Sequence, residues 1–306
     1  MKVCLETVLN VSLNDKQWDW TEAMETWIIE TQEIPTNPSV QKEWGEILMK
    51  KKIGRELTFV RDEDNARLKP IQTKESCAWL NALPCKNVGT LLDDNTLRIC
   101  MGLRLGCDIC QPFTCPCGER IDSKGLHPLC CQKSSGRFFR HSEVNNIIKR
   151  ALATIDVPSI LEPTGMARED GKRPDGATII PWSCGQVLIW DFTCVDTFAK
   201  SYVKQTRCTP GAAAEQASVR KINKYKNLTS TGMHFLPFAT ETMGTWCGKA
   251  KEWTRDVGKK LATKSGNYRA KDFLTQNISL AVQRGNAASI LGALPSDKNM
   301  DEIFYL

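Results

Sequence analysis

The sequence predicts a mixed α/β domain whose sheet is flanked by helices, preceded by a cysteine-rich segment and a helical N-terminal region. Three observations support this fold class. From Ser135 onward, apolar patterns typical of strands alternate with patterns typical of helices. Seven of the 14 cysteines fall between Cys100 and Cys131, and before them apolar residues recur at helical spacing. We therefore expect a helical region, a zinc knuckle, an α/β domain and a C-terminal tail, at residues 1–98, 99–135, 136–292 and 293–306.

Composition sets broad limits on the class of protein. A chain of 306 residues with 41% hydrophobic and 25% charged residues is ordinary for a globular protein. The net charge of +6 is compatible with a nucleic-acid partner, but a solvated basic surface gives the same value. No segment approaches the about 18 apolar residues of a membrane span, and the first residues lack the features of a secretory signal. We expect a nuclear or cytoplasmic location, reduced thiols and no membrane partner.

The N-terminal region predicts helices separated by proline-rich turns. Tryptophan, methionine and isoleucine repeat at helical spacing at Trp20, Met24, Trp27 and Ile28, and again at Trp44, Ile47 and Leu48. The tryptophans could stack on bases, but this spacing is more typical of a helical core. A further helix is expected at residues 74–83. The acids Asp93 and Asp94 are interpreted as a capping loop before the next helix.

The α/β domain begins with an amphipathic helix that we expect at residues 140–152. Apolar runs rich in β-formers predict strands at residues 160–162, 175–180, 187–195 and 235–241. The remaining helices are expected at residues 211–228, 248–262 and 271–291. Strands that alternate with helices in this way favour one sheet with helices packed against it.

The cysteine-rich segment contains a candidate zinc site with two close pairs of ligands. The four candidate ligands are Cys115, Cys117, His127 and Cys131. Three thiolates and one imidazole suit tetrahedral Zn²⁺, and bound metal would let a segment with so little apolar content fold. Cys130 is an alternative fourth ligand, and the pair Cys107 and Cys110 could join the site or replace one ligand. The alternative is a loop of free thiols.

Two aspartates in the α/β domain predict a divalent-metal site. Asp175 lies in a turn before Gly176, and Asp191 lies inside a strand that is otherwise apolar. A carboxylate in a buried strand is costly unless it is paired or holds a metal, and paired carboxylates bind Mg²⁺. Glu162 is a candidate third carboxylate, while Asp196 is a weaker competitor at the expected strand end. The alternative is that Asp175 only makes the turn and Asp191 pairs locally.

Lys221 is expected on the inward face of the helix at residues 211–228. On a helical wheel it falls near the centre of a stripe formed by small and apolar residues. An ammonium group there could pair with the two acids and stabilise negative charge on a reacting phosphate. The alternative is a side chain whose stem packs inside while its head reaches solvent.

Basic residues near the acids predict a contact with nucleic-acid phosphates. Two arginines and a histidine open the first helix of the α/β domain, and two further cations precede Asp175. Arginines at a helix start can hold phosphates together with the free amides there. These candidate contact residues are Arg137, Arg140, His141, Lys172 and Arg173. A solvated helix start is the alternative.

From about Cys115 onward, these motifs together resemble the C-terminal part of early-branching non-LTR retrotransposon proteins. In those proteins a CCHC zinc knuckle directly precedes a restriction-like endonuclease of the PD-(D/E)XK superfamily. The matching blocks, in order, are Cys115/Cys117/His127/Cys131, Gly136-Arg137-x-x-Arg140-His141, Leu161-Glu162-Pro163, Lys172-Arg173-Pro174-Asp175, Val187–Val195 around Asp191, and Lys221-x-x-Lys224-Tyr225. Residues 1–114 are similar to the helical linker that follows the reverse transcriptase in such elements.

The resemblance implies a restriction-endonuclease-like sheet and a Mg²⁺-dependent enzyme that nicks double-stranded DNA. The nick would leave a 3′-hydroxyl that primes reverse transcription, with Asp175 and Asp191 as metal-binding acids and Glu162 as a weaker third. Thr193 stands where the superfamily usually has a lysine, and Lys221 from the following helix matches that role. The knuckle spacing departs slightly from the usual short forms.

The reverse transcriptase is not part of this sequence, so we expect a truncated copy, a domesticated fragment or a piece of a longer gene model. Element RNA and a reverse transcriptase acting in trans are the expected further partners. A non-catalytic remnant that binds nucleic acid through the knuckle and the basic helix start is the alternative function. A third hypothesis is an expressed fossil without a selected function.

Overall fold

The computed structural model describes residues 20–56, 61–166, 171, 173–227, 232–295 and 297–305. The chain forms two compact units, Met1–Arg61 and Asp62–Leu306. Among the described residues, no helix combines the length and the apolar composition needed to cross a membrane. Every cysteine in these described ranges is a free thiol.

The first unit contains two helices that share a pair of tryptophans. Helix α2 spans Trp20–Thr31 and helix α3 spans Gln41–Glu56. The rings of Trp27 and Trp44 are both buried and meet edge to face, with centroids 4.9 Å apart. Each indole N–H donates to a backbone carbonyl of the connecting segment, at Glu33 and Pro38. The two tryptophans, which the sequence places on helices, therefore pack together as the core of these two helices.

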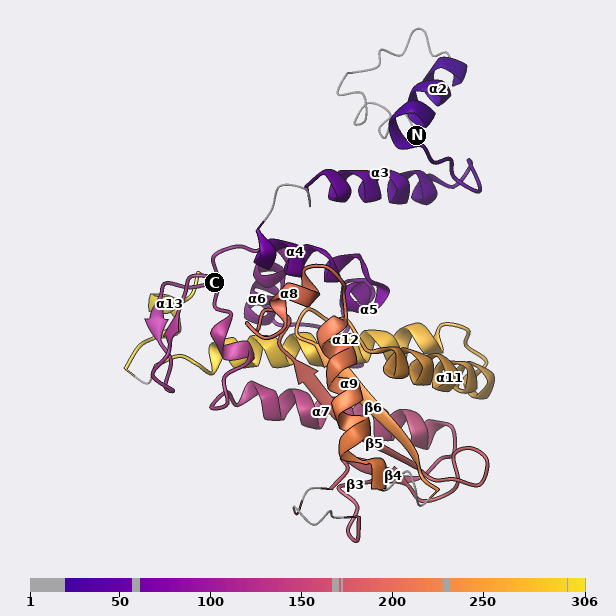
Figure 1. The fold of residues 1–306 in the computed structure, drawn as a ribbon, viewed down its shortest axis with the longest axis vertical. Helices are drawn as coiled ribbons and strands as arrows, with labels where there is room; N and C mark the ends of the chain where they lie inside the picture. Colours follow the sequence, from indigo (N-terminus) through magenta and orange to yellow (C-terminus); the bar gives the residue numbers. More distant parts are fainter. Residues whose placement is uncertain are drawn as a thin grey trace. The chain divides into compact units, whose positions relative to one another are not determined.

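The second unit contains a four-stranded sheet, a two-stranded hairpin and helices around them (Figure 1). Its α-helices are α4 (Asp62–Leu68), α5 (Lys74–Cys77), α6 (Asp94–Leu105), α7 (Gly136–Thr154), α8 (Val203–Thr206), α9 (Ala212–Lys224), α11 (Gly248–Ser265), α12 (Ala270–Leu291) and α13 (Met300–Ile303). Short 3₁₀ helices are η1 (Pro70–Gln72), η2 (Ala78–Asn81) and η3 (His127–Leu129). The strands are β1 (Phe113–Thr114), β2 (Arg120–Ile121), β3 (Ser159–Leu161), β4 (Gly176–Thr178), β5 (Leu188–Val195) and β6 (His234–Glu241).

The main sheet is mixed, with the strand order β3-β4-β5-β6. The pairs β3–β4 and β4–β5 are antiparallel, whereas β5 and β6 run parallel from Leu188↔His234 to Val195↔Glu241. The parallel pair follows from the crossover through α9, because two parallel strands need a long connection. The predicted mixed α/β architecture is confirmed, and each strand and helix expected in this region has a counterpart.

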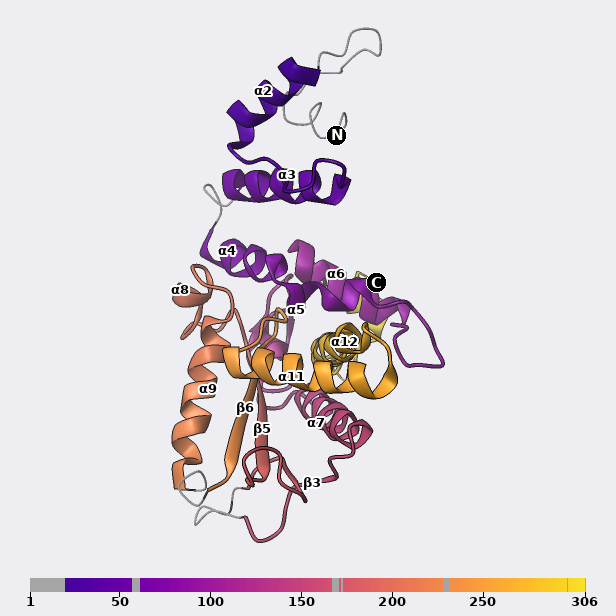
Figure 2. The same cartoon turned by 90° about the vertical axis from the view of Figure 1, so that its right-hand side faces the viewer.

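Helices cover both faces of this sheet (Figure 2). Helix α9 lies along one side of β5 and β6, while α7 and α11 contact these strands on the other side and α12 packs against α7 and α11. Aromatic residues fill the space between them: Phe238 on β6 meets Trp253 of α11 edge to face at 5.8 Å. Trp190 and Phe192 of β5 are buried in the same core. The buried apolar residues of β5 therefore fix this strand in the core, and Asp191 lies on the same strand.

A second apolar core lies around the cysteine-rich segment. It joins α6, the hairpin β1–β2, the C-terminal half of α12 and the last residues of the chain. Residues 303–305 pair with residues 109–111: Gln111 N–H donates to the Ile303 carbonyl at 2.7 Å, and Tyr305 N–H to the Ile109 carbonyl at 3.0 Å. Phe304 is buried there. The segment expected as a C-terminal tail thus packs against the cysteine-rich segment.

Residues 62–105 also pack within this unit, although the sequence placed residues up to 98 in a separate helical region. Trp79 of η2 is buried, and its backbone N–H donates to the Ser279 hydroxyl of α12 at 3.3 Å. The capping interpretation of the acidic loop is confirmed, because the Asp93 side chain accepts from the Thr96 N–H at the start of α6. Nothing in the local sequence argues against a boundary at residue 98, because the packing of residues 62–105 on α12 depends on residues far along the chain.

Candidate functional site

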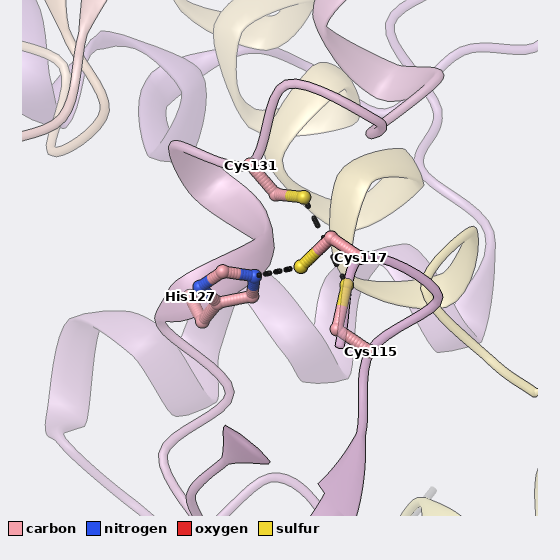
Figure 3. Close-up of side chains that lie close together, drawn as sticks. All are labelled: Cys115, Cys117, His127 and Cys131. Carbon is pink, nitrogen blue, oxygen red and sulfur yellow. Dashed lines mark hydrogen bonds between the residues drawn. The ribbon is translucent and has the colours of Figure 1, made fainter. Parts of the chain in front are cut away.

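Three cysteines and one histidine converge in the cysteine-rich segment (Figure 3). The potential ligand atoms of Cys115, Cys117, His127 and Cys131 all lie within 4.8 Å of one another. The sulfurs of Cys115 and Cys131 are 3.8 Å apart, and the Cys117 sulfur is 3.2 Å from Nε2 of His127. Tetrahedral Zn²⁺ with Zn–S bonds of about 2.3 Å places two sulfurs about 3.8 Å apart. This Cys₃His cluster can hold a metal such as zinc.

The local backbone explains why these four side chains meet. Cys115 and Cys117 lie in the turn of the hairpin β1–β2, where the Cys115 N–H donates to the Glu119 carbonyl at 2.9 Å. Gly118 adopts a φ of +99°, which a residue with a side chain rarely does. After the hairpin, η3 returns His127 to the cluster, and the Cys131 N–H donates to the His127 carbonyl at 3.1 Å.

The structure distinguishes between the alternative ligands. Cys130 is exposed, and its thiol donates to the His127 carbonyl at 3.3 Å, outside the cluster. Cys107 is also exposed, whereas Cys110 is buried and its thiol faces the Asp122 carbonyl. The geometry therefore favours Cys131 as the fourth ligand.

The thiols of the cluster differ in their electrostatic environment. Burial raises the pKa of Cys115 to about 12, while a backbone hydrogen bond at Glu119 helps to lower the pKa of Cys117 to about 7. Metal binding needs thiolates, so a bound cation would displace the proton of Cys115 and would make binding pH-dependent.

Asp175 borders Asp191 from the end of β4. The Asp175 N–H donates to the Trp190 carbonyl at 2.9 Å, and its Oδ2 accepts from the Phe192 N–H at 2.6 Å. Trp190 and Phe192 are the residues on either side of Asp191. The two predicted acids therefore belong to neighbouring, hydrogen-bonded segments of the sheet, which local sequence could suggest but not establish.

Asp191 is a buried carboxylate with two lysines beside it. Its exposed fraction is only 2%. Nζ of Lys221 is 2.5 Å from Oδ1, and Nζ of Lys224 is 3.5 Å from Oδ2. Both lysines belong to α9, so one helix supplies two cations to one carboxylate. On the helical wheel Lys224 lies at the edge of the inward stripe or outside it; its spacing of three residues from Lys221 was the signal that both lie on one face.

A buried glutamate fixes the other end of α9. Glu241, at the end of β6, accepts hydrogen bonds from the N–H groups of Ala213 and Ala214 at 2.9 and 3.3 Å. The hydroxyls of Thr197 and Thr245 also donate to it. Burial raises the pKa of Glu241 despite these donors. Because a carboxylate is favoured at a helix N-terminus, Glu241 anchors the helix that carries both lysines.

His141, on the first helix of the domain, contacts Asp175 directly. Its Nε2 is 2.9 Å from Oδ2 of Asp175, and its Nδ1 faces the buried Asn145 at 3.3 Å. Burial lowers the pKa of His141, but the hydrogen bond and charge of Asp175, together with the charge of Asp191, outweigh it and the pKa is raised. The sequence identified His141 as a phosphate contact and did not identify Asn145, whose polar side chain interrupts the apolar face of α7.

The other predicted residues lie in different environments. Arg137 is exposed at the start of α7, and Arg173 is exposed and paired with Glu162, whose side chain is 67% exposed. Arg140 differs from its prediction: it is 2% exposed, and it donates to the Asn286 side chain of α12 at 2.6 Å. Its guanidinium joins α7 to α12, so it is not placed to contact DNA phosphates. Lys172 lies outside the described residues.

A pocket of about 480 Å³ lies next to this region, although neither Asp175 nor Asp191 is among its lining residues. Arg137, His141 and Lys221 line it together with Phe192 and Thr193. Carboxylate oxygens are the kind of ligand that suits a hard cation such as Mg²⁺. Asp175 accepts a hydrogen bond from the residue after Asp191, and Lys221 is 2.5 Å from Asp191, while Glu162 has its carboxylate turned to Arg173.

Comparison with known proteins gives a distant relationship. No protein-family model matches the chain. The chain is similar to the retrotransposable element SLACS 132 kDa protein of Trypanosoma brucei gambiense, at 25% identity over 211 residues. The matched part covers 66% of this chain but 18% of the SLACS protein, so the chain spans less than a fifth of that relative's length. This similarity supports a retrotransposon-related origin for the chain.

Proposed function

We propose that this chain is a Mg²⁺-dependent endonuclease of retrotransposon origin that nicks double-stranded DNA. The nick would leave a 3′-hydroxyl from which reverse transcription is primed. The observation that supports the proposal is that Lys221, which lines the pocket, pairs with the buried Asp191, next to which Asp175 accepts from the Phe192 N–H. A restriction-like identity of the mixed sheet belongs to the same proposal, and so do element RNA, a reverse transcriptase in trans and a nuclear site of action.

The residues of the site suit hydrolysis of a phosphodiester. Bound Mg²⁺ would polarise the phosphate and lower the pKa of a bound water. Asp175 and Asp191 provide its oxygen ligands, with Glu162 as a weaker third from the strand that precedes them. Water adds to phosphorus and the bond from phosphorus to O3′ breaks, which leaves a 3′-hydroxyl and a 5′-phosphate. Lys221 is placed to stabilise the negative charge that grows on the phosphate oxygens.

Exposed cations around the pocket are proposed to hold the DNA backbone. Arg137 lines the pocket, and Arg173 lies two residues before Asp175 in the chain. His141 also lines the pocket, but its Nε2 is directed at Asp175, so it is not counted among these cations. Lys172 is proposed from sequence for the same role. Arginine binds phosphate with two parallel donors, so contacts of this kind position the duplex without selecting a sequence.

The test is nicking of a supercoiled plasmid, comparing wild type with Asp191→Asn. Asparagine keeps the shape of the side chain, whereas alanine would leave two ammonium groups beside an empty space at a cost of about 3–5 kcal/mol. We expect Mg²⁺-dependent relaxation by wild type and a loss of roughly a hundredfold or more in the variant. Extension of the product by a DNA polymerase checks for the 3′-hydroxyl.

Asp256→Asn is the matched control, because Asp256 is exposed on α11 and lies outside the pocket. It should nick like wild type, and thermal melting should show all three proteins folded. Equal nicking by wild type and Asp191→Asn would refute the catalytic role of Asp191. DNA binding that weakens with salt but brings no Mg²⁺-dependent nicking would instead favour the non-catalytic remnant.

A further inference from the structure

Beside the two acids, a hydrogen-bonded chain that is buried at its Trp190 end joins β5 to α7. The indole N–H of Trp190 donates to Oδ1 of Asn145 at 3.0 Å. The Asn145 amide nitrogen is 3.3 Å from Nδ1 of His141, and Nε2 of His141 is 2.9 Å from Oδ2 of Asp175. Trp190 and Asn145 are both buried. The chain therefore runs from the residue before Asp191 to the carboxylate of Asp175.

Donor and acceptor chemistry fixes the direction of every bond in this chain. An indole N–H can only donate, so the Asn145 atom that faces it must be the carbonyl oxygen. The amide nitrogen of Asn145 then points at His141 and can only donate, so Nδ1 of His141 must accept. The ionised carboxylate of Asp175 can only accept, so Nε2 must carry the proton. A neutral imidazole has one donor and one acceptor, and both are used.

We propose that Asn145 is a positioning residue that holds His141 as the Nε2–H tautomer and so aims its donor at Asp175. Asp175 then receives two fixed donors on Oδ2, from His141 and from the Phe192 N–H. Two donors on one oxygen orient the carboxylate in the plane that its metal-binding role requires. This inference deepens the proposed nuclease function and rests on it for the link to catalysis.

The packing around Trp190 supports the same role. Gly176 follows Asp175, and a Cβ on it would overlap the Trp190 ring. The ring therefore lies directly over the glycine, which is the first residue of β4 and directly follows Asp175. Because the ring is fixed in this way, the direction of its N–H is fixed too, and the whole chain starts from a rigid donor.

The test uses the position of the histidine proton, which nuclear magnetic resonance reports through long-range ¹H–¹⁵N couplings. The full-length chain has three histidines, so ¹⁵N-histidine labelling gives three ring systems, and His141→Gln identifies the relevant one. We expect the Nε2–H pattern for His141 in wild type. The Nδ1–H pattern would overturn the proposal, and this outcome needs neither a variant nor any nuclease activity.

Asn145→Asp then replaces the donor by an acceptor of the same shape while Trp190 keeps its partner. We expect a proton on Nδ1 of His141 and a nicking rate lower by roughly 10- to 100-fold, mainly in kcat. Asn146→Asp makes the same chemical change one residue along α7 and should alter neither signal. Unchanged His141 signals in folded Asn145→Asp would refute the role of Asn145. If wild type shows the Nε2–H pattern without nicking, the proposed function fails while the tautomer assignment stands.

Discussion

The Cys₃His cluster and the acidic cluster differ in how widely their residues are separated along the chain. The Cys₃His cluster takes its four side chains from residues 115–131, within one hairpin and the following turn. The acidic cluster takes Asp175 and Asp191 from two strands, His141 from α7 and Lys221 from α9. A local cluster depends on turns and on a metal, whereas a dispersed one depends on the packing of the whole sheet. Changes should therefore affect them in different ways.

The largest effect is expected from Cys131→Ser in the local cluster. Structural zinc sites in small domains bind with apparent free energies of about 10–16 kcal/mol, so losing one ligand should release the metal and unfold the segment. Elemental analysis should give about one zinc per wild-type chain and none in Cys131→Ser. Cys130→Ser is the control, because the exposed Cys130 lies outside the cluster and its variant should keep the metal. Loss of zinc in Cys130→Ser alone would reverse the ligand assignment.

An intermediate effect on stability is expected when one glycine in each cluster is replaced by alanine. Gly176→Ala forces the Trp190 ring to move, and overpacking of this kind costs about 1–3 kcal/mol. Gly118→Ala meets no neighbouring atom within 4 Å but must keep a φ of +99°, which costs about 1–2 kcal/mol.

Urea unfolding measures both free energies, and plasmid nicking separates the two variants. Gly176→Ala should lose nicking beyond its loss of stability, because Trp190 adjoins Asp191, while Gly118→Ala should nick like wild type once zinc is bound. Equal nicking by both variants would contradict the dependence of the acidic cluster on sheet packing.

The smallest effect is a difference in pH dependence between two glutamates. Burial raises the pKa of Glu241 above its ordinary 4.5, so its folded form prefers the proton. The stability it contributes is present below pH 4.5 and is lost as the pH rises through the raised value. Glu241→Gln removes this loss, so its stability relative to wild type should improve from pH 4.5 upward.

Glu302, on α13, should show the opposite dependence of stability on pH. A backbone hydrogen bond at Asn299 lowers the pKa of Glu302, so its contribution is present above pH 4.5 and is lost as the pH falls through the lowered value. Relative to wild type, Glu302→Gln should therefore become less stable as the pH rises towards 4.5. Urea midpoints at a series of pH values measure both variants, and parallel pH profiles would contradict the assigned directions.

The sequence predicted most of the second unit because its strands and helices carry strong local patterns. The run Leu188–Val195 could only be a buried strand, and the inward stripe of α9 placed Lys221 correctly. The Cys₃His cluster was expected from spacing, with Cys130 left open as an alternative to Cys131, since its four residues belong to one short segment. These features share one property: the residues that determine them are close together in the chain.

The features that sequence missed depend on contacts between distant segments. Arg140 was interpreted as a phosphate contact because it opens a helix, but α12 approaches α7 closely at Gly285 and buries it. Asn145 and Trp190 each had an unremarkable local context, and only the packing of α7 on β5 joins them. The second cation beside Asp191, Lys224, was not assigned a role because a helical wheel does not show which strand faces the helix. The tertiary neighbours, rather than the residues themselves, decide these roles.

The pairing of residues 109–111 with residues 303–305 has a consequence for synthesis of the protein. Residues 303–305 are synthesised after residues 109–111 and after the whole four-stranded sheet. Until they emerge from the ribosome, the edge at residues 109–111 lacks its partner, and unpaired edges invite wrong associations. Early capture of the metal would keep this edge ordered until its partner arrives.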